Sequence, residues 1–256
     1  MRIAVVTQAD PFYVPVFFRS FFEQAPDHPD ILIRAVVDLP SFNEPFPQTV
    51  LRMLRFYGFV DFVRQSVRYV WHKAIDSLGL AAMSVASLCR KHRVPYMKVQ
   101  NINTEAFVEW IKREAIDVLV SVAASQIFKP PLLQAPRWGC INIHSAALPR
   151  YRGMMPNFWA MRFGEDKAGI TIHTMDPEVD RGKVLLQDFL EILPEESLDS
   201  LMRRSKLAGA KLMWKALEQI REGSYALKDY EGPSSYYSFP TPEDVKALRR
   251  RGHPLL

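Results

Sequence analysis

The stretch DVLVSVAASQIFKPPLLQAPRWGCINIHS, residues 117–145, contains two short apolar runs rich in β-branched residues, at 117–123 and 140–145. Such runs are typical of strands that are buried on both faces of a sheet. Comparable runs occur at 2–7, 33–39, 95–100, 169–175 and 184–192, and helical patterns separate the earlier ones at about 14–22, 49–69, 74–92 and 104–114. The alternation predicts an α/β fold, Rossmann-like, with a mostly parallel sheet and helices on both faces.

The carboxyl-terminal part has a different pattern. Residues 196–223 are amphipathic with a helical period, which predicts one long helix that is capped by Ser197 and ends at Gly223. The tail that follows is rich in Pro and Tyr, and we expect an arm with one short helix from Thr241. We interpret 1–192 as the main domain and 193–256 as a helix and arm that do not form an independent domain.

The composition bounds the class of protein. Hydrophobic residues make up 48% and charged residues 24% of the 256 positions, which are values of a globular chain. Cys89 and Cys140 lie in apolar runs and form neither a disulfide framework nor a metal-ligand spacing, so we expect a reducing, cytoplasmic environment. No signal-peptide layout precedes the first strand, and no stretch of 18 uncharged apolar residues predicts a membrane span.

Positive charge is concentrated in residues 45–92, which separate two predicted strands and read as a helical insertion. The net charge of the chain is +5, and arginines recur in this insertion between apolar and aromatic residues. We expect two helices, broken near Gly58 or around 73–79. Core packing or a homodimer face is one interpretation, a basic lid over a diphosphate is a second, and an interfacial membrane helix is a third.

Two polar side chains stand near the end of the strand at 140–145. Asn142 and His144 are two residues apart, so they share one face of a strand. Ligands of open parallel sheets bind beyond the carboxyl ends of the strands, where an amide and an imidazole could converge on one group. A lone histidine on a strand is more often structural. Here Asp180, in a turn-forming stretch between two later strands, could reach the imidazole.

Four spaced motifs surround these residues. They are Asn142-Ile143-His144, Leu148-Pro149-Arg150-Tyr151-Arg152-Gly153, Gly169-Ile170-Thr171-Ile172-His173 and Asp180-Arg181-Gly182. In this order and spacing they resemble the folate-dependent formyltransferases, which include glycinamide ribonucleotide transformylase, methionyl-tRNA formyltransferase and the nucleotide-sugar N-formyltransferases. The resemblance is firm over about 115–190, and the layout is most similar to the nucleotide-sugar enzymes.

The resemblance implies a chemistry for the three polar residues. A primary amine would attack the formyl carbon of 10-formyltetrahydrofolate, and Asn142 and His144 would donate hydrogen bonds to the oxygen that becomes negative. Asp180 would stabilise the protonated ring of His144 and would help to move the amine's proton to the leaving nitrogen. This reaction requires neither a metal nor a covalent enzyme intermediate.

The resemblance also implies where the folate binds. The pterin would pair with the backbone of Ser125, Gln126, Ile127 and Phe128, and Glu178 and Val179 would close the opposite side. His173 aligns with a family histidine beside the folate, although a structural role is equally open. Cys140 is interpreted as core packing.

Two departures from the family pattern concern the acceptor. Ala146 and Ala147 stand where relatives carry a hydroxyl and a large side chain, which suggests an altered acceptor pocket. Arg181 stands where relatives have a small residue or Thr. Together with Arg150 and Arg152, it is a candidate for binding an anionic substrate.

The acceptor amine is inferred by elimination. The segment after the first strand, TQADPFYVPVFF, lacks the glycines with which the purine enzyme wraps a phosphate, and the tail is too short for the barrel domain of the tRNA enzyme. A nucleotide-linked amino sugar is therefore the first choice of partner, and no nucleic acid is expected. Methionyl-tRNA, another small amine, or a non-catalytic folate-binding module remain as alternatives.

Overall fold

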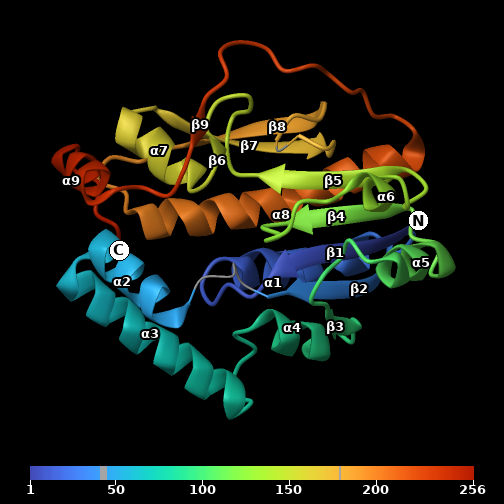
Figure 1. Cartoon of the computed structure of the whole chain (residues 1–256), viewed down its shortest axis with the longest axis horizontal. Helices are drawn as coiled ribbons and strands as arrows, with labels where there is room; N and C mark the ends of the chain where they lie inside the picture. Colours follow the sequence, from blue (N-terminus) through green and yellow to red (C-terminus); the bar gives the residue numbers. More distant parts are fainter. Residues whose placement is uncertain (41–44, 179) are drawn as a thin grey trace.

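This computed structural model describes residues 1–40, 45–178 and 180–256, without the side chain of Phe46. The described residues contain a seven-stranded sheet of order β3-β2-β1-β4-β5-β7-β8 (Figure 1). Its strands are β1 Arg2–Gln8, β2 Leu32–Leu39, β3 Tyr96–Lys98, β4 Val118–Val122, β5 Gly139–His144, β7 Lys167–Thr174 and β8 Val184–Glu191. The strands from β3 to β5 are parallel, whereas β7 and β8 run antiparallel to their neighbours. The predicted α/β class is confirmed.

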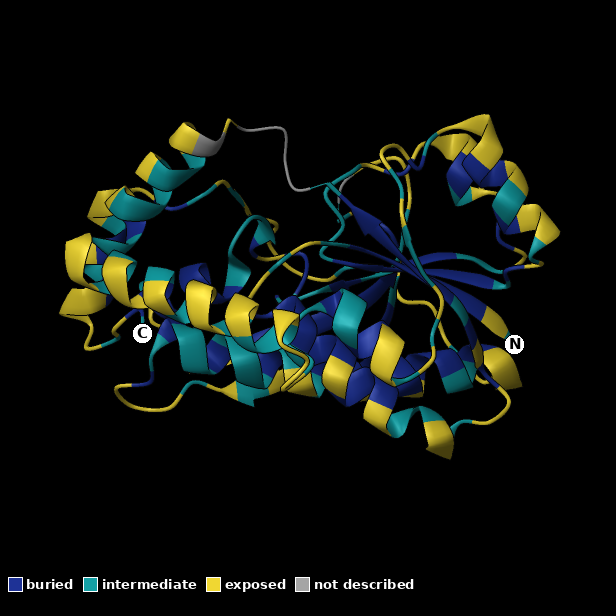
Figure 2. Ribbon diagram, turned by 90° about the horizontal axis from the view of Figure 1, so that it is seen from below, coloured by how far each residue is buried: buried dark blue, intermediate teal, exposed yellow. Residues whose placement is uncertain are grey.

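Helices cover both faces of the sheet because the strands are apolar on both sides (Figure 2). On one face, α1 Val14–Gln24 and α8 Leu198–Glu222 pack against the strands through Phe17, Phe21 and Trp214. On the other face, α5 Glu105–Arg113 and α6 Pro130–Leu133 contribute Phe107 and Leu132. A third apolar cluster lies under α7 Pro156–Phe163 and α9 Pro242–Arg250.

The predicted ends of the carboxyl-terminal helices are confirmed. The Ser197 hydroxyl accepts from the Ser200 amide at the start of α8, and Gly223 ends the helix in the left-handed conformation. Thr241 caps α9 in a reciprocal bond pair with Asp244. The indole of Trp214 donates to the Phe21 carbonyl and stacks on the Phe21 ring, so α8 is fastened to the core that the strands share.

The insertion forms α2 Phe46–Tyr57, α3 Phe59–Ser77 and α4 Val85–Lys91. Gly58 separates α2 from α3 with φ +75° and ψ 168°, a conformation that glycine adopts readily and other residues avoid. A continuous helix over 49–69 is therefore wrong, and the break lies at Gly58. A helix over 74–92 is also wrong, because α3 continues through Lys73 to Ser77 and Ser84 then caps a separate helix.

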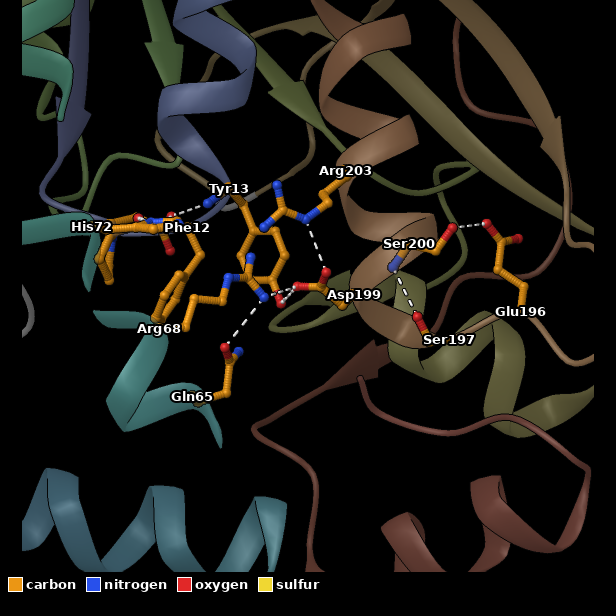
Figure 3. A network of polar contacts seen from close by, with 12 residues as sticks. Phe12, Tyr13, Gln65, Arg68, His72, Glu196, Ser197, Asp199, Ser200 and Arg203 are labelled. Atoms are coloured by element: carbon orange, nitrogen blue, oxygen red, sulfur yellow. Dashed lines mark hydrogen bonds and ion pairs between the residues drawn. The ribbon is translucent and has the colours of Figure 1, made fainter. Parts of the chain in front are cut away.

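A half-buried carboxylate joins α3 to the core (Figure 3). Asp199, in the first turn of α8, accepts from the Tyr13 hydroxyl at 2.9 Å, from Arg68 Nη1 of α3 at 2.9 Å and from Arg203 Nε at 2.8 Å. The guanidinium of Arg68 also lies 4.7 Å from the centre of the Phe12 ring. One acidic side chain thus connects the insertion, α1 and α8.

The carboxyl-terminal arm crosses back over the sheet (Figure 1). Its strand β9 Tyr236–Tyr237 pairs in parallel with β6 Arg152–Gly153. A side chain at Gly153 would lie 2.3 Å from the Tyr237 carbonyl oxygen, so glycine is required where the arm approaches. Among the described residues, no helix combines the length and apolarity needed to cross a membrane.

Removing the carboxylate of Asp199 should destabilise the protein, because Arg68 would then remain largely buried without its partner. We expect Asp199→Ala to lower the free energy of unfolding by about 3 kcal/mol in urea denaturation. Lys246→Ala, which removes an exposed ion pair with Glu243, is the control and should cost less than about 1 kcal/mol. Equal losses in the two variants would contradict the structural role of Asp199.

Candidate active site

The sheet changes from parallel to antiparallel beside β5, and two of the predicted catalytic residues lie there. Asn142 pairs with His173 of β7 in register, and His144 pairs with Thr171. Ile141 and Ile143, which alternate with them, belong to the core under α8. Asn142 and His144 therefore share the opposite face of β5, as their spacing predicts.

His173 fixes the orientation of the Asn142 amide. Its Nδ1 lies 2.8 Å from the Thr174 carbonyl oxygen, which only accepts, so Nδ1 carries the hydrogen in the neutral ring. Nε2 is then an acceptor for Asn142 Nδ2 at 3.1 Å. Burial lowers the pKa of His173 to about 4, so the ring is neutral near pH 7 and keeps this arrangement. The second N–H of the Asn142 amide is left for another acceptor.

His144 is held between a carbonyl and a carboxylate. Its Nε2 donates to the Tyr151 carbonyl oxygen at 3.0 Å, and its Nδ1 lies 3.8 Å from Asp180 Oδ1. Asp180 is held in turn by the Gly153 amide, which donates to Oδ2 at 3.2 Å. The distance of 3.8 Å exceeds a hydrogen bond, so a reacting group can contact both side chains.

The loop that carries Asp180 depends on a glycine. Asp180 itself adopts a left-handed φ of 54°. Two residues later, a side chain at Gly182 would lie 1.6 Å from the Thr174 carbonyl oxygen. Close approach of the loop to β7 therefore explains the Asp-x-Gly motif in physical terms.

A cavity of about 210 Å³, here named the Asn142 cavity, opens on one side of these residues. Asn142, His173 and Asp180 line it together with the 124–128 loop and residues 175–178. Ser125, Gln126, Ile127, Phe128 and Glu178, which the sequence predicts to bind folate, all line this cavity. Val179 lies outside the described residues.

The side chains of the 124–128 loop are mostly engaged within the protein. Ser125 Oγ donates to the Pro40 carbonyl, and Gln126 bonds both the Ile102 amide and the Gln100 carbonyl. Phe128 is buried, whereas Ile127 is 63% exposed. The cavity offers the loop backbone on one side and the carboxylates of Asp176 and Asp180 as acceptors on the other.

A second cavity of about 290 Å³, here named the His144 cavity, opens on the other side of the imidazole. Met154, Met155, Phe158 and Phe239 give it apolar walls. Its charged members besides His144 are Asp10, from the loop after β1, and Lys206, from α8. Burial lowers the pKa of Lys206. Ala124 lines both cavities, and Asp180 of the Asn142 cavity lies 3.8 Å from His144 of the His144 cavity.

A third cavity of about 550 Å³, here named the Tyr69 cavity, lies between α3 and the ends of β1 and β2. Asp10 lines it as well as the His144 cavity. Tyr69, His72 and Lys73 of α3 form one wall. Burial raises the pKa of Asp38 on the opposite wall, which favours its uncharged form relative to an exposed carboxyl.

The amino terminus of α1 is filled by the protein itself. Asp10 Oδ1 accepts from the amides of Phe12, Tyr13 and Val14. These are the donors that an external phosphate would use at a helix amino terminus. The absence of glycine in this loop and the presence of Asp10 both disfavour a phosphate at this position.

The three predicted substrate-binding arginines are not brought together. Arg150 pairs with Glu165 and lines a separate depression, and Arg181 pairs with Glu178 at the surface. Arg152 lies closer to the site, with its guanidinium 6.0 Å from the centre of the Tyr236 ring. None of these arginines lines the His144 cavity, although Arg152 directly precedes Gly153, which does.

Several residues of the site escape sequence reasoning. Asp10, Tyr13 and Lys206 come from segments outside the recognised motifs, and only the fold brings them to the His144 cavity. The Tyr151 carbonyl and Gly153 amide act through the backbone, although Gly153 belongs to a recognised motif. Cys140 is buried, and burial raises the pKa of its thiol. The described residues contain no group of three or more His, Cys, Asp or Glu that could hold a metal ion.

Comparison with known proteins identifies the family. The Formyl transferase family model matches residues 74–217, more than half of the chain, and the protein belongs to this family. The methionyl-tRNA formyltransferase of Thermotoga maritima is 30% identical over 159 residues, 62% of this chain and 51% of that protein. The methionyl-tRNA formyltransferase of Pelobacter propionicus is 37% identical over 139 residues, which are 54% of this chain and 44% of that protein. The chain spans about half the length of these curated relatives.

Solved structures show the same fold. A sugar N-formyltransferase from a Shewanella species has a TM-score of 0.61 and 19% identity, with 98% of this chain and 87% of that chain covered. Glycinamide ribonucleotide transformylase 1 from Symbiobacterium toebii has a TM-score of 0.61 and 15% identity, with 90% of this chain and 94% of that chain covered. An N-formyltransferase from Helicobacter canadensis, solved with folinic acid and dTDP-3-aminofucose, has a TM-score of 0.59 and 16% identity, with 98% and 81% covered.

The low pKa of His173 predicts a loss of stability in acid. The pKa is about 4 in the folded protein against an ordinary value of 6.5, so the unfolded chain binds the proton more readily. The free energy of unfolding should therefore fall by about 2 kcal/mol through this residue between pH 7 and pH 5. Urea denaturation of the wild type and His173→Gln measures this. The difference in free energy of unfolding between wild type and variant should change by about 2 kcal/mol between pH 7 and pH 5. A difference that stays constant would contradict the low pKa assigned to His173.

Proposed function

We propose that the protein transfers a formyl group from 10-formyltetrahydrofolate to the primary amine of a nucleotide-linked amino sugar. The main support is that Asn142 and Asp180 line one cavity and His144 lines another, with only 3.8 Å between Asp180 Oδ1 and His144 Nδ1. The formyl donor would occupy the Asn142 cavity, and the amine would enter from the His144 cavity. Lining residues from α8 support treating 193–256 as part of the same catalytic unit rather than as a separate domain.

Asn142 would stabilise the developing charge. The acceptor amine attacks the formyl carbon, a C–N bond forms, and the carbonyl oxygen gains negative charge before the bond to the folate nitrogen breaks. One N–H of the Asn142 amide is held by His173, so the other can donate to this oxygen. Because the amide is already oriented, little reorganisation is needed in the transition state.

His144 and Asp180 would stabilise the oxyanion and transfer the proton that the attacking amine loses. Since Nε2 of His144 is used by the Tyr151 carbonyl, Nδ1 is the nitrogen that faces the reacting atoms and Asp180. When protonated, Nδ1 donates to the oxygen beside Asn142. Asp180 accepts the proton that the amine loses, and the proton then passes to the folate nitrogen that leaves. No atom of the protein becomes covalently linked to the substrate.

The shape of the acceptor side supports a small, extended substrate. The amino sugar would lie in the His144 cavity, and the nucleotide portion would extend past Asp10 into the Tyr69 cavity. Lys73 is the cationic side chain in the lining of this cavity that is available for a diphosphate. Asp10 at the amino terminus of α1 argues against the phosphate position of a purine precursor.

Methionyl-tRNA is the second candidate acceptor. The relatives at 30% and 37% identity are methionyl-tRNA formyltransferases, and the insertion is basic. The two acceptors differ in how many phosphates they present. A tRNA makes several phosphate contacts over a broad surface, whereas a nucleotide sugar requires one or two cations.

Removal of either proposed oxyanion donor should lower turnover. We expect Asn142→Ala and His144→Ala each to reduce kcat about 10²–10³-fold, and Asn142→Asp to behave like Asn142→Ala because it loses the donor while keeping the shape. Asn101→Ala, which changes an exposed asparagine away from the cavities, is the control. Near-normal kcat in Asn142→Asp would rule out the proposed role of the amide.

The acceptor can be identified directly. We expect formylation of an amino-sugar nucleotide, with a KM that changes less than about tenfold between 50 and 200 mM salt, and no formylation of initiator methionyl-tRNA. Lys73→Met should raise the KM for the nucleotide sugar about tenfold with little change in kcat, since it removes one charged hydrogen bond. Lys91→Met, on the exposed end of α4, is the matched control. Efficient formylation of the tRNA would overturn the sugar assignment.

A further inference from the structure

Helix α3 has its polar and apolar faces reversed relative to an ordinary surface helix. The face toward the protein carries a polar stripe at helical spacing, Asp61, Gln65, Arg68, His72 and Asp76. The outward face carries an apolar stripe, here named the α3 apolar face, formed by Phe59, Val60, Val63, Val67, Val70 and Trp71. A soluble helix normally buries its apolar face and exposes its polar one.

The inward polar stripe is satisfied by specific contacts, so the orientation of α3 is fixed (Figure 3). Gln65 is only 5% exposed and donates to the Tyr57 hydroxyl. Arg68 bonds Asp199, and Asp61 accepts from Arg249 at 2.9 Å. Asp76 accepts from the Met83 amide and the Ser84 hydroxyl. Rotating the helix to bury its apolar face would break all of these contacts.

The outward stripe is strongly exposed. Phe59 is 76% exposed, and Val67, Val70 and Trp71 are each 64% exposed. Leu78 and Leu80, just beyond the helix, extend the stripe at 72% and 73%. The helix lies along the lower edge of the molecule in Figure 1, and from below, in Figure 2, its turns are seen at the surface. A contiguous apolar strip of this kind indicates an interaction surface.

The charge of the residues around the α3 apolar face favours one kind of partner over another. Residues 46–77 contain five Arg and Lys against two Asp, and both Asp side chains are turned inward and bonded. Arg64 of α3 and Arg55 of α2 are exposed. A second copy of the chain would bring the same positive charge against it and is therefore disfavoured. An anionic partner is favoured.

We propose that the α3 apolar face binds the surface of a membrane that contains anionic lipids. Helices that lie in the membrane interface present an apolar stripe with aromatic residues and are flanked by Lys or Arg, and a helix of this length can lie flat while it stays docked on the protein. The proposal concerns binding alone. It does not depend on which amine is formylated, because the α3 apolar face is on the opposite side of the helix from the polar stripe that faces the core.

Vesicle sedimentation of the full chain tests this proposal. Wild-type protein should sediment with vesicles of phosphatidylglycerol and phosphatidylcholine at a 3:7 ratio, and at least about tenfold more weakly with pure phosphatidylcholine. Val67→Glu combined with Val70→Glu should weaken binding to the anionic vesicles by about tenfold or more. Leu32→Glu, at a half-exposed position at the start of β2, is the matched control and should bind as the wild type does.

Fluorescence locates the contact. Among the described tryptophans Trp71 alone is exposed, so anionic vesicles should shift the emission to shorter wavelength in the wild type and not in Trp71→Phe. Sedimentation equilibrium without lipid tests the alternative that the α3 apolar face forms a homodimer. A stable dimer that Val67→Glu converts to a monomer, or no binding of the wild type to anionic vesicles, would overturn the proposal. Formyl transfer to a soluble amine should be unchanged in the Val67→Glu, Val70→Glu variant.

Discussion

The antiparallel pairing of β5 with β7 is the constraint on which the candidate site depends. This pairing puts Asn142 opposite His173 and leaves Ile141 and Ile143 on the core face. A slip of one residue would turn the polar side chains of β5 into the core, at a prohibitive cost in buried polar groups. Gly169 in β7 permits the close approach, since a side chain there would lie 2.2 Å from the Ala147 amide nitrogen.

The pairing of β5 with β7 also determines where the loops around the candidate site lie. The strands from β3 to β5 end together, as in other parallel sheets, and the loops beyond them form the cavities. Because β7 runs opposite to β5, its last residue, Thr174, pairs with Ile141, and the loop that follows folds back so that Asp180 lies 3.8 Å from His144. A carboxylate far away in the sequence therefore completes the arrangement that Asn142 and His144 begin. The buried, neutral His173 supports this arrangement without facing solvent itself.

Much of this could be predicted from sequence, and the rest could not for physical reasons. The strands follow from apolar runs, and the caps at Ser197 and Thr241 follow from local chemistry, so both were predictable. The family motifs located Asn142, His144 and Asp180. A break was predicted near Gly58 or around 73–79, and the structure has one at Gly58 and another after Ser77. Lys206 and Asp10 share no local pattern with the motifs, and the reversed faces of α3 become visible only when the exposed side is known.

The pairing of β9 with β6 also has a consequence for the timing of synthesis. Residues 236–237 hold the backbone at Gly153, whose amide in turn bonds Asp180. A ribosome makes the sheet strands before it makes this arm, and a growing domain folds as its segments emerge. The nascent chain can therefore form its parallel core early, but it positions Asp180 fully only after the arm has emerged. The candidate site would therefore be completed late in translation, after the strands of the core have been made.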